Sequence, residues 1–368
     1  MACEIRIYDK DFNWVGTVKN AESIQFTRSF YGIGGFEIHI HPEKNYAGKL
    51  CQRGNFIIIN GNMEKMGIIR YFTLNESRDG ASISVFGDTV KGFANQRIII
   101  PPTKTENPLA YGWDRISGNA ETVIKHYLKR SLTNSSISGR NIPFIEIAED
   151  SGRGQTAKWQ ARYQNLGEVI QEIAEMYDIG WKAYFDPERE MILYDIDEGT
   201  DRTLSQTENS SVTFKLEYSN IGEYSYTEDF SNFRTTGICG GSGEDENRLI
   251  YTLGGEAEGA WRFEEFLDCG NAKDITELIH YGEQKLSEFK EIKHIEADAL
   301  PKAFIFEEDF FLGDKVSVYI GRINSTEDTR ITEVKEIWER DSGYSYEIKF
   351  GYDLPNIYTA LKPKAVIR

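Results

Sequence analysis

Residues 66–87 read "MGIIRYFTLNESRDGASISVFG", and residues 330–351 repeat their pattern as "RITEVKEIWERDSGYSYEIKFG". In both stretches a β-rich run leads through a turn with Arg, Asp and Gly into a second run that ends in Phe-Gly. The preceding stretches also correspond, "RGNFIIING" (53–61) with "LGDKVSVYIG" (312–321). An internal repeat of this kind predicts two related β-domains in one chain. The alternative interpretation is that hairpins with tight turns resemble one another by chance.

The first β-domain is predicted at residues 1–100, where short runs alternate between apolar and polar side chains. In "FEIHIH" (36–41) the apolar residues all fall on one face of a strand. Asp79-Gly80 is a pair typical of a tight hairpin, because glycine tolerates positive φ. The second β-domain is predicted from residues 201–240 together with 303–353.

A small α+β module is predicted between them, at residues 101–200. Three prolines in "PPTKTENPLAY" (101–111) mark its boundary with the first β-domain. Apolar spacing predicts a helix over 119–130 and a better one from Asn165, which can cap it while Glu168 closes the capping box. Asp186-Pro187 is predicted to turn a hairpin after this helix.

A second module is predicted as an insertion at residues 241–302, with a helix near 274–290. Residues 354–368 would then form a C-terminal tail. The fold class predicted from these patterns is mainly β with α+β insertions.

The composition excludes several classes of protein. The chain has 368 residues with 59 acidic and 42 basic side chains, a net charge of −17, whereas a nucleic-acid binder should carry a basic stripe. No apolar run approaches the roughly 18 residues that a membrane helix needs. The N-terminus, "MACEIRIYDKDF", lacks the features of a signal peptide, so we expect synthesis in a cytoplasm. The four cysteines have no CxxC spacing and are expected to be reduced, structural thiols.

The segment "GICGGSGEDENR" (237–248) is rich in glycine and raises the question of a phosphate site. A phosphate-binding loop leads from a strand into a helix, whose N-terminus faces the anion. Here three acidic residues and then a strand-like run follow the glycines. We therefore expect a mobile hairpin connection rather than a nucleotide site.

No other pattern identifies catalytic, cofactor-binding or metal-binding residues. His39 and His41 would share one strand face, but no third zinc ligand accompanies them in a known motif. A glycosidase needs two carboxylates about 5–10 Å apart, and adjacent pairs such as Glu264-Glu265 or Glu307-Glu308 are more typical of a solvated face. The serine-hydrolase motif GxSxG is absent from a strand–turn–helix context.

Three stretches of the chain nevertheless resemble one family. They are "IRIYDKDFNWVGTVKNAESIQFTRSFYGIGGFEIHI" (5–40), "LGEVIQEIAEMYDIGWKAYFD" (166–186) and "GTDRTLSQTENSSVTFKLEYSNIGEYSYTEDFSNFRTTGICGGSGEDENR" (199–248). The last contains a Gly-x-Asp-Arg-Ser/Thr start, a Ser-Asn-aromatic strand and a Gly/Glu-rich loop before arginine. The matching positions are Thr203, Phe214, Ser231, Asn232, Phe233 and Arg248. Together these stretches are similar to the tail-hub, or tail-tip, structural proteins of siphoviruses.

This resemblance implies two related tube-like antiparallel β-barrels, plus the two smaller α+β modules, in each chain. It also implies a homotrimeric baseplate hub whose pseudo-sixfold ring joins a hexameric tail tube to a spike or fibre. The implied partners are tail-tube or distal tail proteins, the spike or fibre and other baseplate proteins, within a virion or phage-like particle. DNA would pass through the lumen without specific binding, which the negative charge favours.

Longer members of the family carry a C-terminal peptidoglycan-cutting domain. The chain stops soon after "KFGYDLPNIY", so we expect no such domain, no enzyme activity and no cofactor. Two alternatives remain open at this stage: a tail enzyme that degrades peptidoglycan or glycans, and a tail protein that binds a receptor or carbohydrate. The sequence leaves open whether the particle is a contractile tail, a non-contractile tail or a bacteriocin.

Overall fold

The structure is a computed structural model that describes residues 3–78, 80–103, 105–106, 112–270, 272–300 and 303–352. The chain divides into two compact units. The larger unit comprises the described residues up to Glu223 and those from Ala297 to Ile348, and the smaller one comprises the rest. Strands make up most of the regular structure, so the predicted mainly β class with small α+β sheets is confirmed.

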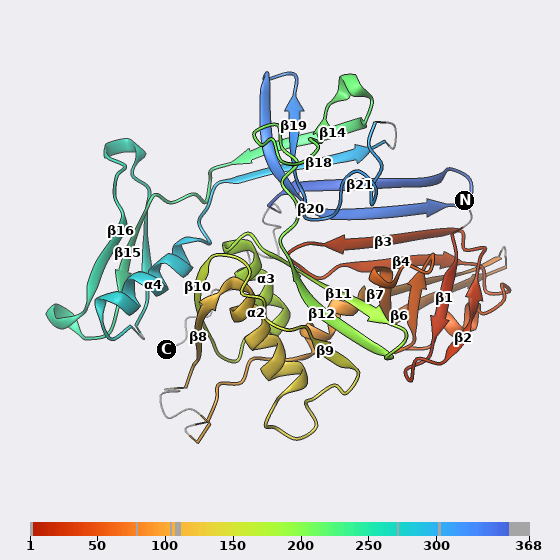
Figure 1. The fold of residues 1–368 in the computed structure, drawn as a ribbon, viewed down its shortest axis with the longest axis horizontal. Helices are drawn as coiled ribbons and strands as arrows, with labels where there is room; N and C mark the ends of the chain where they lie inside the picture. Colours follow the sequence, from red (N-terminus) through yellow and green to blue (C-terminus); the bar gives the residue numbers. More distant parts are fainter. Residues whose placement is uncertain are drawn as a thin grey trace. The chain divides into compact units, whose positions relative to one another are not determined.

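The larger unit is built on one large sheet (Figure 1). Its central order is β21-β20-β3-β4-β7-β6-β5-β1-β2, while β19 pairs with β20 and β13 pairs with β19. The strands are β1 (Ile5–Tyr8), β2 (Trp14–Val18), β3 (Ser23–Ser29), β4 (Gly35–Ile40), β5 (Phe56–Ile59), β6 (Met66–Ser77), β7 (Gly80–Thr89), β13 (Thr213–Phe214), β19 (Lys315–Ile320), β20 (Ser325–Glu339) and β21 (Gly343–Gly351).

The two repeated stretches form the same arrangement of three consecutive strands. β5 pairs with β6 and β6 with β7, as β19 pairs with β20 and β20 with β21. The predicted hairpin between β6 and β7 is confirmed, since their antiparallel ladder ends at Ser77 opposite Gly80, although Asp79 lies outside the described residues. In the second hairpin Gly343 has a φ of 89°, which only glycine adopts readily.

In the residues that it describes, the structure does not show the two closed, tube-like barrels that the resemblance implied. β20 pairs antiparallel with β3, from Glu333 opposite Ser29 to Glu339 opposite Ser23. The free edge of β3 is thus satisfied by a strand of the other repeat, and the two strand sets join into one sheet. Among the described residues the strand order is an open path, and no pairing closes either set on itself.

The core of this sheet follows from the alternation in the sequence. In β3 and β4 every second residue is buried, because successive side chains point to opposite faces of a strand. The resulting cluster contains Ile5, Ile7, Val18, Ile24, Phe26, Phe36, Ile38, Ile40, Ile57, Ile59, Ile69, Ile83 and Val85, with Ala47 and Leu50 from α1 (Ala47–Leu50).

The α+β module has the predicted helices and hairpin. Asn165 caps the second helix, because its side-chain oxygen accepts hydrogen bonds from the N–H groups of Gly167 and Glu168. β8 pairs with β10, and β11 and β12 form the predicted antiparallel hairpin, with β9 parallel to β12. The elements are β8 (Asp114–Asn119), α2 (Ala120–Leu128), a π-helical turn (Lys129–Thr133), β9 (Ile145–Ile147), β10 (Thr156–Ala161), α3 (Leu166–Met176), β11 (Gly180–Asp186) and β12 (Met191–Asp197).

The smaller unit contains a three-stranded sheet in the order β16-β15-β17 and one helix, α4. α4 begins after Asp274, which caps it, and it packs its apolar face on one side of the sheet. β14 and β18 are hydrogen-bonded neighbours and do not belong to this three-stranded sheet. The elements are β14 (Ile221–Asp229), β15 (Thr236–Gly240), β16 (Ile250–Gly254), β17 (Glu264–Asp268), α4 (Ile275–Leu286) and β18 (Ile292–Ala299).

Several short 3₁₀ turns connect these elements. They are η1 (Met63–Lys65), η2 (Val90–Gln96), η4 (Leu216–Tyr218), η5 (Asp245–Asn247) and η6 (Gly259–Trp261).

Candidate functional site

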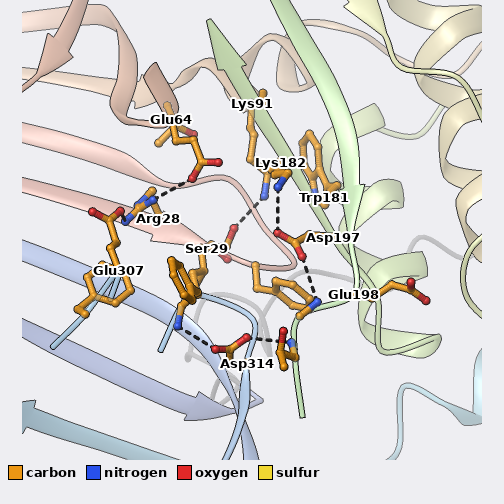
Figure 2. Close-up of a pocket in the computed structure, with 18 of the residues that line it drawn as sticks. Arg28, Ser29, Glu64, Lys91, Trp181, Lys182, Asp197, Glu198, Glu307 and Asp314 are labelled. Carbon is orange, nitrogen blue, oxygen red and sulfur yellow. Dashed lines mark hydrogen bonds and ion pairs between the residues drawn. The ribbon is translucent and has the colours of Figure 1, made fainter. Parts of the chain in front are cut away.

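A polar cavity of about 840 Å³ lies in the larger unit (Figure 2). The end of β3, η1, η2 and the start of β11 form part of its wall. The segments 197–200 and 306–314 complete it, so that side chains from both ends of the chain meet there.

A buried ion network borders this cavity where β3 meets β20. The Glu336 carboxylate is 1% exposed and accepts hydrogen bonds from Lys65 Nζ at 2.7 Å and from the Tyr344 hydroxyl at 3.0 Å. Glu307 pairs with Lys65 at 2.9 Å and with Arg28. Burial alone would raise the pKa of Glu307, but the charges of Arg28 and Lys65 lower it below its usual value. Glu307 is therefore held ionised, whereas the general acid of a glycosidase must hold its proton.

Lys91 lines another wall of the cavity and is 6% exposed. Its ammonium donates a hydrogen bond to the Ser29 carbonyl at 2.8 Å and lies 4.1 Å from the centre of the Trp181 ring. Burial lowers the pKa of Lys91 well below its usual value, while the charge of Asp197 acts in the opposite direction. These contacts fix the lysine between β3 and β11.

Asp178 joins the α+β module to β19 and β20. Its carboxylate accepts two hydrogen bonds from Arg330, at 2.7 and 2.8 Å, and one from Tyr31, and pairs with Lys315 at 2.7 Å. Burial would raise the pKa of Asp178, but hydrogen bonds and charge from Arg330, with Lys315 and Tyr31, lower it to about 2. Asp178 has a φ of 51°, in the left-handed region just after α3.

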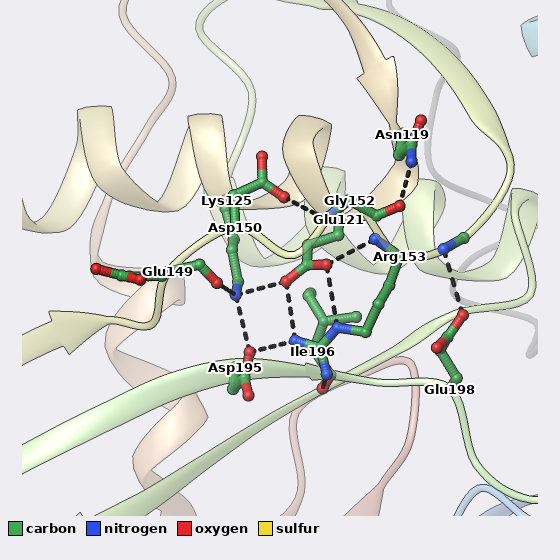
Figure 3. Close-up of polar contacts among 11 residues, drawn as sticks. Asn119, Glu121, Lys125, Glu149, Asp150, Gly152, Arg153, Asp195, Ile196 and Glu198 are labelled. Carbon is green, nitrogen blue, oxygen red and sulfur yellow. Dashed lines mark hydrogen bonds and ion pairs between the residues drawn. The ribbon is translucent and has the colours of Figure 1, made fainter.

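A second buried network holds the α+β module together (Figure 3). Glu121, on α2, is fully buried and binds Lys125 at 2.6 Å and Arg153 at 2.8 Å. Both cations also bind Asp195 on β12, at 2.8 and 2.5 Å. The pKa of Glu121 is well below its usual value, because hydrogen bonds from Arg153 and Lys125 outweigh the effect of burial. The two negative charges of Glu121 and Asp195 are balanced by the two positive charges of Lys125 and Arg153. The network therefore links α2 to β12 and leaves no unpaired charge within it.

Most of the candidate catalytic or metal-binding side chains have their own bonding partners. Glu264 pairs with Arg262, Glu265 with Arg234, and Glu307 belongs to the network with Arg28. His39 contacts Ser84 and Glu37, and His41 accepts a hydrogen bond from the backbone of Glu43. Within the described ranges, no group of three or more His, Cys, Asp or Glu side chains is placed to hold a metal ion.

The glycine-rich segment forms the connection between the antiparallel strands β15 and β16, as predicted. Gly241 and Leu249 close it with hydrogen bonds, and Gly243 has a φ of 108°. Arg248 donates to the Gly241 carbonyl at 3.2 Å and pairs with Asp268 at 2.7 Å. The strand β16 follows the loop, so the glycines do not lead from a strand into a helix as they do in a phosphate-binding loop.

Sequence reasoning did not identify Arg28, Lys91 or Asp178. Each gains its partners from segments far away in the chain, and no local motif marks them. The one available signal was a lysine inside the otherwise apolar run "TVKGFA" (89–94), which indicates burial but not its consequence. All four cysteines are free thiols, with Cys239 and Cys269 buried in the smaller unit. In the part of the chain that the structure describes, no helix has the length and apolar character needed to cross a membrane.

Three solved structures share the fold over nearly the whole chain. A tail protein from Neisseria meningitidis MC58 has a TM-score of 0.56 at 11% identity, with 96% of this chain and 97% of that chain covered. The 43 kDa tail protein of prophage MuSo2 from Shewanella oneidensis has a TM-score of 0.59 at 9% identity, with 95% and 98% covered. Prophage tail protein gp18 from Listeria monocytogenes EGD-e has a TM-score of 0.56 at 13% identity, with 97% and 96% covered.

A search of curated proteins found no match to the sequence. The family comparison, in contrast, matches residues 4–352 to the Siphovirus ReqiPepy6 Gp37-like proteins. This match covers almost the entire chain and confirms the resemblance to siphovirus tail proteins that the sequence indicated. The chain belongs to the Siphovirus ReqiPepy6 Gp37-like protein family and has the fold of phage tail proteins.

Proposed function

We propose that the chain is a structural hub of a phage or phage-like tail. Three copies form a ring with pseudo-sixfold symmetry, which joins a hexameric tail tube to a central spike or fibre. The observation that supports this is the repeated arrangement of β5-β6-β7 and β19-β20-β21 within one chain. Two similar strand sets in each of three subunits present six similar surfaces to a sixfold neighbour.

We further propose that each strand set corresponds to one tube-like barrel domain of the ring. β3 and β4 pair and precede the first set, as β14 and β18 are neighbours and precede the second. The inserted module would then lie between β14 and β18 and include β15, so it begins before the boundary expected at residue 241. Exposed edge strands such as β2 would be covered by neighbouring subunits, which prevents uncontrolled pairing.

The role we propose is non-enzymatic, with DNA passing through the lumen unbound. Three of the four candidate carboxylates, Glu264, Glu265 and Glu307, are engaged in ion pairs. The net charge of −17 favours repulsion of DNA from the ring wall. A cryo-EM structure of the ring with basic side chains lining the lumen would contradict this repulsion of DNA.

Light scattering on the purified full-length chain tests the ring. We expect a species of three times the 42.1 kDa of one chain, and six-pointed rings in negative-stain images. A chain that stays monomeric at high concentration and never joins a tail-tube protein would contradict the hub. A peptidoglycan zymogram tests the non-enzymatic role, since lysis by the pure protein would exclude a purely structural function.

A further inference from the structure

The three-stranded sheet of the smaller unit has one face directed away from α4, on which its outer strands carry exposed side chains. α4 packs against the opposite face, where Cys239, Leu253 and Leu267 are buried. Ile238 on β15 lies opposite Phe266 on β17 in the parallel ladder, and side chains in register share a face. Ile250 lies opposite Gly240, two residues further along β15, and so belongs to the same face.

This face carries the apolar side chains of Ile238, Ile250 and Phe266 beside the polar side chains of Thr252, Glu264 and Asp268, and Ile238 is half-buried. Ile250 and Phe266 are each 53% exposed, and Trp261, in the turn before β17, is 77% exposed. Clusters of large exposed apolar side chains on a folded surface mark interaction sites, and aromatic residues are enriched at interface centres. We call Ile238, Ile250 and Phe266 the open face of the smaller unit.

Acidic loops lie at both ends of the open face. Because β15 and β16 are antiparallel, their connection (241–249) lies at one end of the sheet and the connection from β16 to β17 (255–263) at the other. The first carries Glu244, Asp245 and Glu246, and the second carries Glu256 and Glu258, all exposed.

The charge of this region is not balanced internally. Residues 241–270 contain eight acidic and two basic side chains. The acidic residues of β17 are already paired, Asp268 with Arg248 and Glu264 with Arg262, while Arg234 pairs with Glu265. Arg248 also lies over the Phe266 ring, 5.4 Å from its centre. Among the described residues, no salt bridge engages the carboxylates of the two end loops, so they are able to interact with another molecule.

We propose that the open face binds a partner protein whose surface has an apolar centre flanked by lysine or arginine residues. The open face of a second copy does not fit, because its acidic loops would be placed against those of the first. The hydrogen bonds that close the loop between Gly241 and Leu249 hold the acidic end in place before binding, which lowers the entropic cost of association. The proposal concerns a contact with a different protein and does not depend on the ring.

Binding of defined peptides to the full-length chain tests the proposal. The probe is a fluorescent 12-residue peptide that alternates leucine and lysine, and its counterpart alternates leucine and glutamate. We expect the lysine peptide alone to bind, with an affinity that falls on raising NaCl from about 50 to about 300 mM. Anisotropy measures the affinity, and urea unfolding of each variant confirms that it is folded.

Two double variants separate the apolar and the charged contributions. Ile250→Thr with Phe266→Thr keeps β-branched residues on the strands, and Glu256→Lys with Glu258→Lys reverses one acidic loop. The apolar variant should weaken binding roughly tenfold, as for residues near an interface centre. The charge variant should also weaken binding, because it places like charges opposite the lysines of the peptide. The matched control is Glu188→Lys with Glu208→Lys, which makes the same change of charge at exposed positions of the larger unit and should leave the affinity unchanged.

Three results would overturn the proposal: equal binding of both peptides, an equal loss of affinity in the control, or unchanged binding by the apolar variant. Dissociation of a homo-oligomer by Ile250→Thr with Phe266→Thr would also do so, because it would make the open face a contact between copies. If the full-length chain forms no trimer but still binds the lysine peptide, only the proposed ring is contradicted.

Discussion

At the scale of single residues, buried charges position the elements of the larger unit. Asp178 contacts Arg330, Lys315 and Tyr31, which come from three different segments. Its left-handed backbone conformation directs the chain from α3 towards β11. Asparagine tolerates this conformation as well as aspartate does, so Asp178→Asn removes the charge without straining the backbone.

The pH dependence of stability should reflect Asp178. Its pKa in the folded protein is about 2, below the value of about 3.9 for an unfolded chain, so it stabilises the fold above pH 4. This contribution is lost as the pH falls from about 4 to about 2. We expect Asp178→Asn to lower the free energy of unfolding by about 1 kcal/mol at pH 7, because the carboxylate is partly exposed.

Urea unfolding at several pH values measures the effect. The stability of Asp178→Asn should decline less than that of the wild type between pH 4 and 2. Asp11→Asn, at an exposed position, is the control and should follow the wild type. An equally steep decline in Asp178→Asn would show that other groups carry the acid sensitivity.

At the scale of elements, a capping residue fixes where α3 begins, and an ion network fixes which strand α2 packs against. Asn165 starts α3 by accepting hydrogen bonds from Gly167 and Glu168, and it also donates to the Asn95 carbonyl. The Glu121 network connects α2 to β12 in the same module. The first feature is local in sequence and the second is not.

Asn165→Ala should lower the free energy of unfolding by about 1 kcal/mol, because two N–H groups at the start of α3 lose their acceptor. Asn165→Ser also loses the bond to Asn95 but keeps a capping oxygen, and we expect it to cost only a few tenths of a kcal/mol. Circular dichroism during thermal unfolding compares the two variants. Equal destabilisation would assign the effect to the Asn95 contact and not to the cap.

At the scale of the whole molecule, charge limits the partners. With 59 acidic and 42 basic residues, the chain should repel nucleic acids. We expect no binding of a fluorescent 20-base-pair duplex at 50 mM salt, with a Kd weaker than about 10⁻⁴ M. Saturable binding in the micromolar range would contradict an inert lumen wall.

Local features of the sequence predicted local structure well. The turn before Gly80, the cap at Asn165 and the glycine-rich connection after β15 were all identified from short patterns. Each depends on backbone preferences within a few residues. The family was recognised for a different reason, since many weak positions spread over the chain matched together.

The long-range pairing could not be predicted in the same way. β3 and β20 are separated by about 300 residues, and their alternation allows several partners. The closed barrels were implied by the resemblance to tail-hub proteins, and alternation by itself does not specify closure. The network of Arg28, Lys65, Glu307 and Glu336 was missed for the same reason, because it forms only when those strands meet.

The pairing of β20 has a mechanical consequence. The first part of this strand pairs with β19 and the second part with β3, so one continuous backbone belongs to both repeats. Tension applied along the strands would be transmitted from one repeat to the other without crossing a flexible linker. To slide apart, the repeats would have to shear the seven residue pairs from Glu333–Ser29 to Glu339–Ser23 together, and not peel them one by one.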